Sequence, residues 1–205
     1  MLMLPRDFRP IIVLTVIVSA CAPVMAGPID IVLQPTIQTV GLGSNVSVGV
    51  WVQSNDGANH LMAAADVMFA WDNSYLQFNG VNNAGAVPLL ASYLPNISPN
   101  EALPPVDGDG FYQAYAFLGS PINVTPAGVL LTTFTFTSLA PTLSTLVEIL
   151  PGAGSPNINT AVYDGTVPNL VVTGNLGFTK IKIVPEPSTI GLLLAASMLF
   201  VRRRR

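Results

Sequence analysis

The sequence predicts an all-β protein, an antiparallel β-sandwich that lies between two export signals. Three observations support this prediction. Apolar residues recur at every second position in several stretches of the middle of the chain, which is the period of a half-buried strand. Turn-forming residues separate these stretches, and no helical periodicity replaces them. An apolar segment beside arginines lies near each end of the 205-residue chain. We therefore expect a signal peptide over residues 1–26, a sandwich domain over 27–184 and a sorting signal over 185–205.

The first 26 residues have the three parts of a secretory signal peptide. Arg6 and Arg9 precede an apolar run over residues 11–22, and a small-residue cleavage pattern, Val24-Met25-Ala26, follows. We expect cleavage between Ala26 and Gly27.

Val18-Ser19-Ala20-Cys21 also resembles a lipoprotein lipobox, in which Cys21 would be acylated. Cys21 is the only cysteine of the chain. The sequence leaves open whether this residue is lipidated or is removed with the signal peptide.

The alternating stretches follow one another through the middle of the chain and predict about eight or nine short strands. In the clearest of them, Val46–Val52, valines alternate with Ser47, Gly49 and Trp51. Turns such as Asn55-Asp56-Gly57 separate the stretches, because these residue types accept turn conformations readily. Since no βα alternation occurs, we expect antiparallel pairing. The other expected strands cover residues 67–71, 75–78, 111–117, 130–137, 145–150, 170–173 and 179–184.

Residues 82–109 form the longest stretch without clean alternation. Five prolines exclude a continuous helix from it. A single helical turn over residues 84–93 is the alternative to irregular structure there.

Three of these stretches resemble the cohesin and carbohydrate-binding-module superfamily of β-sandwiches. Residues 46–52 are similar to its opening strand, and residues 65–72 with the following Tyr75-Leu76 are similar to its strand that ends in an aromatic residue and Asp. Residues 128–136 resemble its Gly-x-Leu-x-x-x-x-Phe strand. The resemblance implies a jelly-roll-like, cohesin-like sandwich that binds a ligand. It identifies no dockerin-recognition residues.

The C-terminal stretch has three parts in a fixed order. Pro185-Glu186-Pro187 comes first and is extended, because each proline fixes φ and biases the residue before it away from helix. An uncharged apolar run over 188–201 follows, and a basic cluster after such a run lies on the cytoplasmic side of a membrane. A helix over 187–201 would span roughly 22 Å at ~1.5 Å per residue, less than the ~30 Å hydrocarbon core. We therefore interpret it as a short transmembrane processing signal. The basic cluster is Arg202, Arg203, Arg204 and Arg205.

This stretch closely resembles the PEP-CTERM sorting signal of Gram-negative bacteria, whose motif Pro185, Glu186 and Pro187 match literally. The resemblance implies that an exosortase, a membrane transpeptidase-like enzyme, is a processing partner. It also implies a transient inner-membrane anchor and a final place in the cell envelope or outside the cell. The alternative is an ordinary tail anchor. The sequence does not decide between a surface-attached and a released final state.

The expected mature domain is acidic and poor in charge. Residues 27–184 contain nine Asp and Glu residues and two Lys residues, which gives a net charge of −7. Such a domain lacks the basic footprint that nucleic-acid binding requires. After processing no cysteine remains, which excludes disulfides, thiol catalysis and Cys-ligated zinc.

Catalytic patterns are missing from the sequence. The single histidine, His60, stands beside a turn without a nucleophile motif, so we interpret it as a loop residue rather than a catalytic base. The domain has two glutamates, Glu101 and Glu148, and a glycosidase-type carboxylate pair is the alternative that they leave. We therefore predict that the protein is not an enzyme and needs no cofactor.

Two groups of residues are candidate binding sites. Asp107 and Asp109, separated by glycine, form a candidate Ca²⁺ site, or else a tight turn before the next strand. Trp51, Tyr112 and Tyr115 are candidates for sugar stacking if they are exposed in a row, because aromatic faces are apolar and rigid. We expect Trp71 to lie in the core.

These observations predict an exported, non-catalytic protein of the cell envelope or of an extracellular biofilm matrix. It would hold exopolysaccharide or a surface protein through one face of the sandwich. A carbohydrate-binding module proper is the first alternative, and three aligned exposed aromatic residues would favour it. A secreted hydrolase is the second. The sequence identifies neither the ligand nor the oligomeric state.

Overall fold

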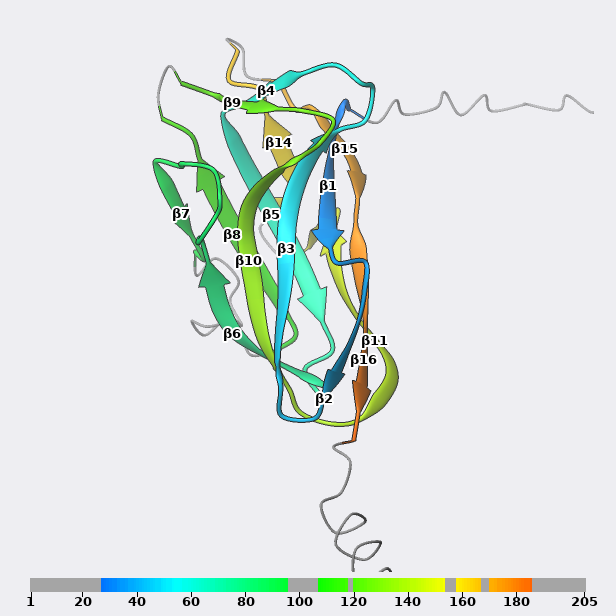
Figure 1. The fold of residues 1–205 in the computed structure, drawn as a ribbon. Helices are drawn as coiled ribbons and strands as arrows, with labels where there is room; N and C mark the ends of the chain where they lie inside the picture. Colours follow the sequence, from blue (N-terminus) through cyan, green and yellow to red (C-terminus); the bar gives the residue numbers. More distant parts are fainter. Residues whose placement is uncertain (1–26, 96–106, 118–119, 154–157, 167–169, 186–205) are drawn as a thin grey trace, which may run out of the picture.

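The computed structural model describes residues 27–95, 107–117, 120–153, 158–166 and 170–185, and every regular element among them is a β-strand (Figure 1). No helix in this part of the chain is long and apolar enough to cross a membrane. The predicted signal peptide lies outside the described residues, and so does the sorting signal beyond Pro185.

Two sheets pack face to face and form the sandwich (Figure 1). The first sheet has five strands, in the order β15 (Thr173–Leu176), β1 (Ile29–Gln34), β3 (Asn45–Ser54), β10 (Val129–Ser138) and β6 (Leu76–Asn82). The second has seven, in the order β2 (Ile37–Gly41), β16 (Phe178–Val184), β11 (Thr142–Leu150), β5 (Ala64–Trp71), β8 (Asp109–Tyr115) and β7 (Ala91–Tyr93), with β14 (Ala161–Tyr163) also paired to β5.

Two small sheets complete the described elements. One joins β4 (His60–Met62) to β9 (Ile122–Val124), and the other joins β12 (Gly152–Ala153) to β13 (Ile158–Asn159). In Figure 1, β1 begins at the top of the sandwich and β16 ends at its bottom. The first and last strands of the described chain therefore leave the domain at opposite ends.

The core consists of the inward-facing residues that the period-two pattern predicted. On β3, the four valines from Val46 to Val52 are fully buried. Five aromatic rings form the centre, where Phe69 and Phe134 stack across the two sheets with centroids 4.0 Å apart. Trp71 packs against Phe69 at 5.5 Å and is 6% exposed, which confirms its predicted place in the core. The remaining rings of this cluster are Phe78 and Phe136.

The fold class is the predicted all-β sandwich, but the details differ from the sequence-based expectation. Sixteen strands occur among the described residues instead of eight or nine, because many have only two or three residues and show no periodicity. Residues 84–93, where a single helical turn was the alternative to irregular structure, contain no helix and end in the extended strand β7. Two pairings, β1 with β15 in one sheet and β2 with β16 in the other, are parallel, whereas the sequence predicted antiparallel pairing.

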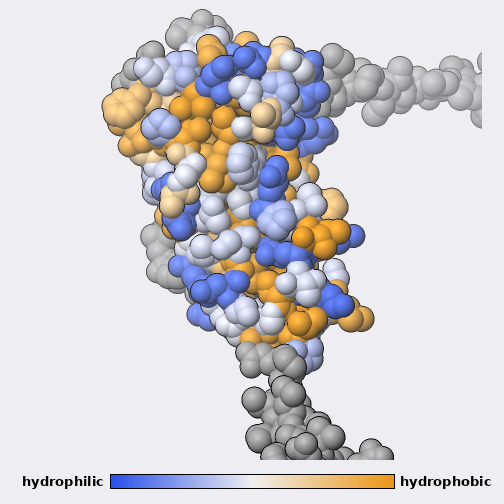
Figure 2. All heavy atoms as spheres, viewed as in Figure 1, coloured by the Kyte–Doolittle hydropathy of each residue, from blue (hydrophilic) through white to orange (hydrophobic). Residues whose placement is uncertain are grey.

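The surface reflects the low charge content of the chain. Figure 2 shows hydrophilic and hydrophobic atoms intermixed over the face seen in Figure 1. Charged residues make up 9% of the chain, so uncharged polar residues must separate the apolar atoms. Neutral hydroxyls and amides therefore dominate the polar surface.

Candidate functional site

Three tyrosines from three strands gather on the outer face of the seven-stranded sheet. Tyr93 on β7 pairs with Gln113 on β8, which pairs with Asp66 on β5. In the next row of the same face, Ala64 of β5 lies between Tyr115 of β8 and Tyr163 of β14. Residues that face one another across a ladder point to the same side of the sheet. We call Tyr93, Tyr115, Tyr163, Asp66 and Gln113 the tyrosine face.

Direct contacts hold the tyrosine face together. The rings of Tyr93 and Tyr115 stack with centroids 6.3 Å apart and an angle of 25° between their planes. The Gln113 side-chain nitrogen donates a hydrogen bond of 2.8 Å to Asp66 Oδ1. The Tyr163 hydroxyl also interacts with the Asp66 carboxyl. Tyr93 is 44% exposed, while Tyr115 and Tyr163 are half-buried, so the cluster presents its rings to solvent.

The environment raises the pKa of two of these tyrosine hydroxyls. Burial, a hydrogen bond with Tyr93 and the nearby Asp66 carboxylate raise the pKa of Tyr115 to about 12. Burial and the charge of the Asp66 carboxylate also raise the pKa of Tyr163. Burial also raises the pKa of Asp66, and its bonds to Gln113 and Tyr163 oppose that shift. The face thus combines aromatic rings, neutral hydroxyl donors and one carboxylate acceptor.

Tyr112, one of the predicted stacking residues, is instead part of the core. Its side chain is fully buried and lies edge-to-face against Phe134, with centroids 6.1 Å apart. Its hydroxyl bonds the Ser92 hydroxyl at 2.5 Å and donates to the Leu131 carbonyl at 3.3 Å. Tyr112 stands an odd number of residues before Tyr115 on the same strand, so the two rings point to opposite faces. The prediction of sugar stacking is therefore wrong for Tyr112.

Trp51 lies on the other side of the molecule from Tyr115. It is half-buried on the outer face of the five-stranded sheet. Its indole packs over Gly49, where a Cβ atom would come within 2.7 Å of Trp51 Nε1. The three residues predicted to stack on sugar therefore form no common row. Tyr93 and Tyr163, which join Tyr115 instead, lie on three-residue strands without alternation, and only their aromatic character marked them in the sequence.

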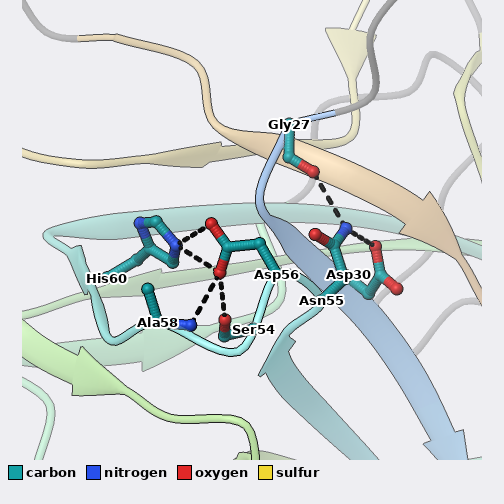
Figure 3. A network of polar contacts seen from close by, with 7 residues as sticks. All are labelled: Gly27, Asp30, Ser54, Asn55, Asp56, Ala58 and His60. Carbon is teal, nitrogen blue, oxygen red and sulfur yellow. Dashed lines mark hydrogen bonds and ion pairs between the residues drawn. The ribbon is translucent and has the colours of Figure 1, made fainter.

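His60 belongs to a turn network rather than to a catalytic arrangement (Figure 3). Its Nε2 lies 2.9 Å from both carboxylate oxygens of Asp56, and the Ser54 hydroxyl donates to Asp56 Oδ1 at 2.9 Å. The hydrogen bond with His60 is the main reason why the pKa of Asp56 falls to about 2. Ser54 and His60 both contact the carboxylate and not each other, so the network has no base beside a nucleophile.

Neighbouring hydrogen bonds from the same turn hold the first residues of the domain in place. The Asn55 side chain donates to the Gly27 carbonyl at 3.0 Å and to Asp30 Oδ1 at 2.7 Å (Figure 3). The Gly27 nitrogen donates to the Thr173 carbonyl at 2.7 Å. A Cβ atom at position 27 would come within 2.3 Å of the Val172 backbone, so this position fits glycine only.

The candidate Ca²⁺ residues form a turn at the start of β8. Gly108, between Asp107 and Asp109, has a φ of 108°. Its carbonyl accepts a 2.7 Å hydrogen bond from the backbone nitrogen of Trp71. Burial and the charge of Asp107 raise the pKa of Asp109, so the two carboxylates sense each other. No group of three or more His, Cys, Asp or Glu side chains that could hold a metal occurs in the described part of the chain.

Several predicted residues lie outside the described residues, so their geometry carries no argument. Of the sequence motifs, Gly27 and Pro185 are described and stand at the two ends of the domain. Glu148 is exposed on β11, whereas Glu101, its suggested catalytic partner, is not described. The other predicted residues outside the described part are Cys21, Ala26, Glu186, Pro187, Arg202, Arg203, Arg204 and Arg205.

Comparison with known proteins identifies the fold through structure alone. No sequence-family model matches the chain, and no curated protein matches it. A cohesin module from a family 33 glycoside hydrolase of Clostridium perfringens is 14% identical, with a TM-score of 0.54, and the match covers 79% of this chain and 99% of that one. A type I cohesin solved in complex with a dockerin from Clostridium thermocellum is 12% identical, with a TM-score of 0.53, and the match covers 76% and 99%. A second cohesin from a Clostridium thermocellum cohesin–dockerin complex is 8% identical, with a TM-score of 0.51, and the match covers 80% and 99%. The protein therefore has a cohesin-like β-sandwich fold.

Proposed function

We propose that this protein is an exported, non-catalytic module that binds polysaccharide of the cell envelope or extracellular matrix through its tyrosine face. The observation that carries the proposal is the gathering of Tyr93, Tyr115 and Tyr163 around the hydrogen-bonded pair of Asp66 and Gln113. A sugar ring has apolar C–H faces and a rim of hydroxyl groups. Aromatic rings pack against the faces, and the carboxylate, the amide and the phenol groups bond the rim.

The charge of the domain narrows the ligand class. Its net charge of −7 between residues 27 and 184 repels strongly anionic chains. The proposed ligand is therefore a neutral polysaccharide. Two or three stacked rings at about 0.5–1.5 kcal/mol each give weak binding of a single sugar unit, in the millimolar range. A polysaccharide with many repeated units would bind more firmly through multivalency.

Export and sorting complete the proposal. A signal peptide cleaved before Gly27 and a PEP-CTERM signal at Pro185-Glu186-Pro187 would deliver the domain to the envelope, with an exosortase as the processing enzyme. The fold supports this order, because β16 ends at the opposite end of the sandwich from the end where β14 and the last residues of β8 lie (Figure 1). A tail in the inner membrane would leave the tyrosine face near the end of the sandwich that is far from the bilayer.

A retention assay tests the binding function. The exported protein is purified from cells that express the full chain, immobilised and exposed to the extracellular matrix of its own organism. Sugar analysis of the eluate is expected to find a neutral polysaccharide, and Tyr93→Ala with Tyr115→Ala should remove most of it. Phe178→Ala is the matched control, because Phe178 is an exposed aromatic residue on a different part of the same sheet. Equal retention by the double variant and the control would refute the proposal.

A protein partner is the second candidate, favoured by the likeness to cohesins that were solved with dockerins. Exposed apolar residues lie on β2, β16 and β11 of the seven-stranded sheet, where a protein surface could bury them. Mass spectrometry of the same eluate would identify that partner. These residues are Ile37, Phe178 and Leu146.

The sorting proposal has its own test. Pro185→Ala with Pro187→Ala is expected to leave the C-terminal tail attached in cell fractions, because the extended recognition element is lost. Pro141→Ala, in the turn before β11, is the control and should mature normally. Normal maturation of the double variant would rule out PEP-CTERM processing.

A further inference from the structure

The outer face of the five-stranded sheet carries a half-buried tryptophan. Trp51 lies on β3 between Val32 of β1 and Leu130 of β10. Residues paired across a ladder point to the same side of a sheet, so these three side chains are neighbours on one face. All three are half-buried and therefore partly open to solvent. We call Trp51, Val32, Leu130 and two polar neighbours, Gln34 and Thr133, the tryptophan face.

Two glycines determine how the Trp51 indole lies. A Cβ atom at Gly49 would come within 2.7 Å of Trp51 Nε1 and 3.3 Å of its Cδ1, and one at Gly128 would come within 3.6 Å of its Cε3. A glycine inside a strand weakens it and often marks a place of close approach. Here the missing Cβ atom of Gly49 leaves room for the indole to lie against the backbone of β3. The accessible part of the ring is therefore on the side away from the sheet.

The Trp51 indole nitrogen is available as a donor. Trp51 Nε1 has no hydrogen-bond partner among the described residues. Two side-chain atoms there are both buried and unpartnered, Trp71 Nε1 and Thr145 Oγ1, and Trp51 Nε1 is not one of them. It therefore reaches solvent, where a bound molecule can offer it an acceptor.

The neighbouring row of the same face supplies further polar groups. Gly49 precedes Trp51 by two residues, so it stands on the same side of β3. It is paired with Gln34 of β1 and with Thr133 of β10. Gln34 is exposed and Thr133 is half-buried. An amide and a hydroxyl each donate and accept hydrogen bonds, so the indole is bordered by neutral groups that can bond sugar hydroxyls.

The composition of the sheet selects a neutral ligand. Asp30 is the only charged residue in its five strands, and its Oδ1 already accepts hydrogen bonds from the Asn55 side chain at 2.7 Å and from the Asn175 backbone nitrogen at 2.6 Å. A surface so poor in charge does not attract a charged polymer. An aromatic ring bordered by an amide and a hydroxyl fits the apolar face and the hydroxyl rim of a neutral sugar.

The same sheet is poorly suited to a protein partner. None of the exposed large apolar residues in the described part of the chain lies on β15, β1, β3, β10 or β6. The core of a protein–protein interface is apolar and dry, and a single half-buried indole does not provide such a core. A polysaccharide needs only a ring to pack on and groups to bond.

We propose that the tryptophan face is a second site for neutral polysaccharide, through which the domain cross-links two polysaccharide chains. This inference rests on the proposed function, which places the first chain on the tyrosine face. The two faces are the outer surfaces of different sheets, and these sheets are ~10 Å apart with the core between them. One extended chain cannot lie on both without bending around an edge strand. Occupation of both faces therefore joins two chains.

Nuclear magnetic resonance of the Trp51 indole group tests the second site. The full chain is expressed in ¹⁵N medium and purified in the form that the host leaves it, and Trp51→Phe assigns the two indole resonances. Linear hexasaccharides of glucose, mannose, galactose and N-acetylglucosamine are each titrated into the millimolar range. At least one is expected to shift the Trp51 resonance saturably and to leave that of Trp71, which is 6% exposed, unchanged.

A matched pair of variants tests the polar neighbours of the indole. Thr133→Val should weaken the binding about fivefold, because one hydrogen bond to the sugar is lost. Thr137→Val is the control and should bind as the unmodified chain does. Thr137 lies on the same side of β10, about 13 Å away at ~3.3 Å per residue, and its hydroxyl is bonded to Asn79. No saturable Trp51 shift with any of the four sugars, or equal binding by the two variants, would overturn the inference.

Light scattering tests the cross-linking. The polymer of the sugar that binds is mixed with the protein, and the unmodified chain is expected to join its chains into larger particles. Trp51→Ala should abolish this growth while the polymer still retains the protein through the tyrosine face. Undiminished growth with Trp51→Ala would overturn the cross-linking role. So would a protein from the matrix that the unmodified chain retains and Trp51→Ala does not.

The two proposals fail in different ways. Tyr93→Ala with Tyr115→Ala should keep the saturable Trp51 shift, even where it loses the retention of matrix polysaccharide. A normal Trp51 shift beside unchanged retention by this double variant would refute the tyrosine face and leave the tryptophan face standing. An absent Trp51 shift beside lost retention would do the reverse.

Discussion

Replacing Tyr112 by alanine is expected to cost far more stability than replacing Tyr93, although both are tyrosines on neighbouring strands. Tyr112 is fully buried, packs on Phe134 and bonds Ser92, whereas Tyr93 is 44% exposed. Truncation of a buried aromatic side chain to alanine costs about 3–5 kcal/mol, and the lost hydroxyl bond adds about 1 kcal/mol. We therefore expect Tyr112→Ala to lower the free energy of unfolding by about 4–6 kcal/mol. A domain of this size has about 5–15 kcal/mol in total.

Tyr93→Ala removes one stacking contact with Tyr115 and little buried area. Its expected cost is below about 1.5 kcal/mol. Urea denaturation followed by fluorescence measures both variants. With a slope of about 2 kcal/mol per molar urea, Tyr112→Ala should lower the midpoint by about 2–3 M and Tyr93→Ala by less than 1 M.

Tyr112→Phe separates the ring from the hydroxyl and should lose only about 1 kcal/mol. Equal midpoints for Tyr112→Ala and Tyr93→Ala would refute the placement of Tyr112 in the core. If Tyr112→Ala is strongly destabilised as expected, a loss of binding in this variant reflects unfolding rather than a lost sugar contact.

Three further predictions follow from single contacts. Gly110→Ala should cost about 1–3 kcal/mol in urea denaturation, because its Cβ would come within 2.5 Å of the Phe69 ring, and Phe69→Leu should recover part of the added cost; an additive double variant would contradict this explanation. The hydrogen bonds of the Asp56 carboxylate lower its pKa to about 2. They stabilise the native state when the pH is above the ordinary pKa of an Asp, and this stabilisation is lost as the pH falls towards about 2. Stability should therefore fall less steeply between pH 4 and pH 2 in Asp56→Asn than in the unmodified chain, and parallel curves would argue against the His60 contact. Removal of Ca²⁺ by a chelator should leave the melting temperature unchanged, since Asp107 and Asp109 offer two carboxylates where Ca²⁺ needs six to eight oxygen ligands; a clear decrease would restore the Ca²⁺ site.

The sequence predicted the strands whose side chains alternate over many residues. The predicted alternation of Val46–Val52 and the predicted core position of Trp71 are both confirmed, because the direction of a side chain in a strand follows from the local backbone alone. Short strands escaped this reasoning. Two or three residues, as in β7 and β14, are too few to show a period, and their pairing with distant strands creates them.

The choice of face on β8 shows the limit of local pattern. Tyr112 and Tyr115 are three positions apart on β8, so the period of a strand places their side chains on opposite sides. Phe111, on the same side as Tyr115, is also buried, so both sides of the strand are apolar. Only the position of the five-stranded sheet decided that Tyr112 points into the core.

By itself, the sequence determined the all-β class, the acidic and cysteine-free domain and most of the inward-facing residues, because composition and period are properties of the chain. The tertiary structure alone decided which residues gather. Tyr93, Tyr115 and Tyr163 come from three strands spread over 71 residues and meet because β7, β8, β5 and β14 pair in that order. The tyrosine face depends on strand neighbours that lie far apart along the chain, and no local pattern specifies such neighbours.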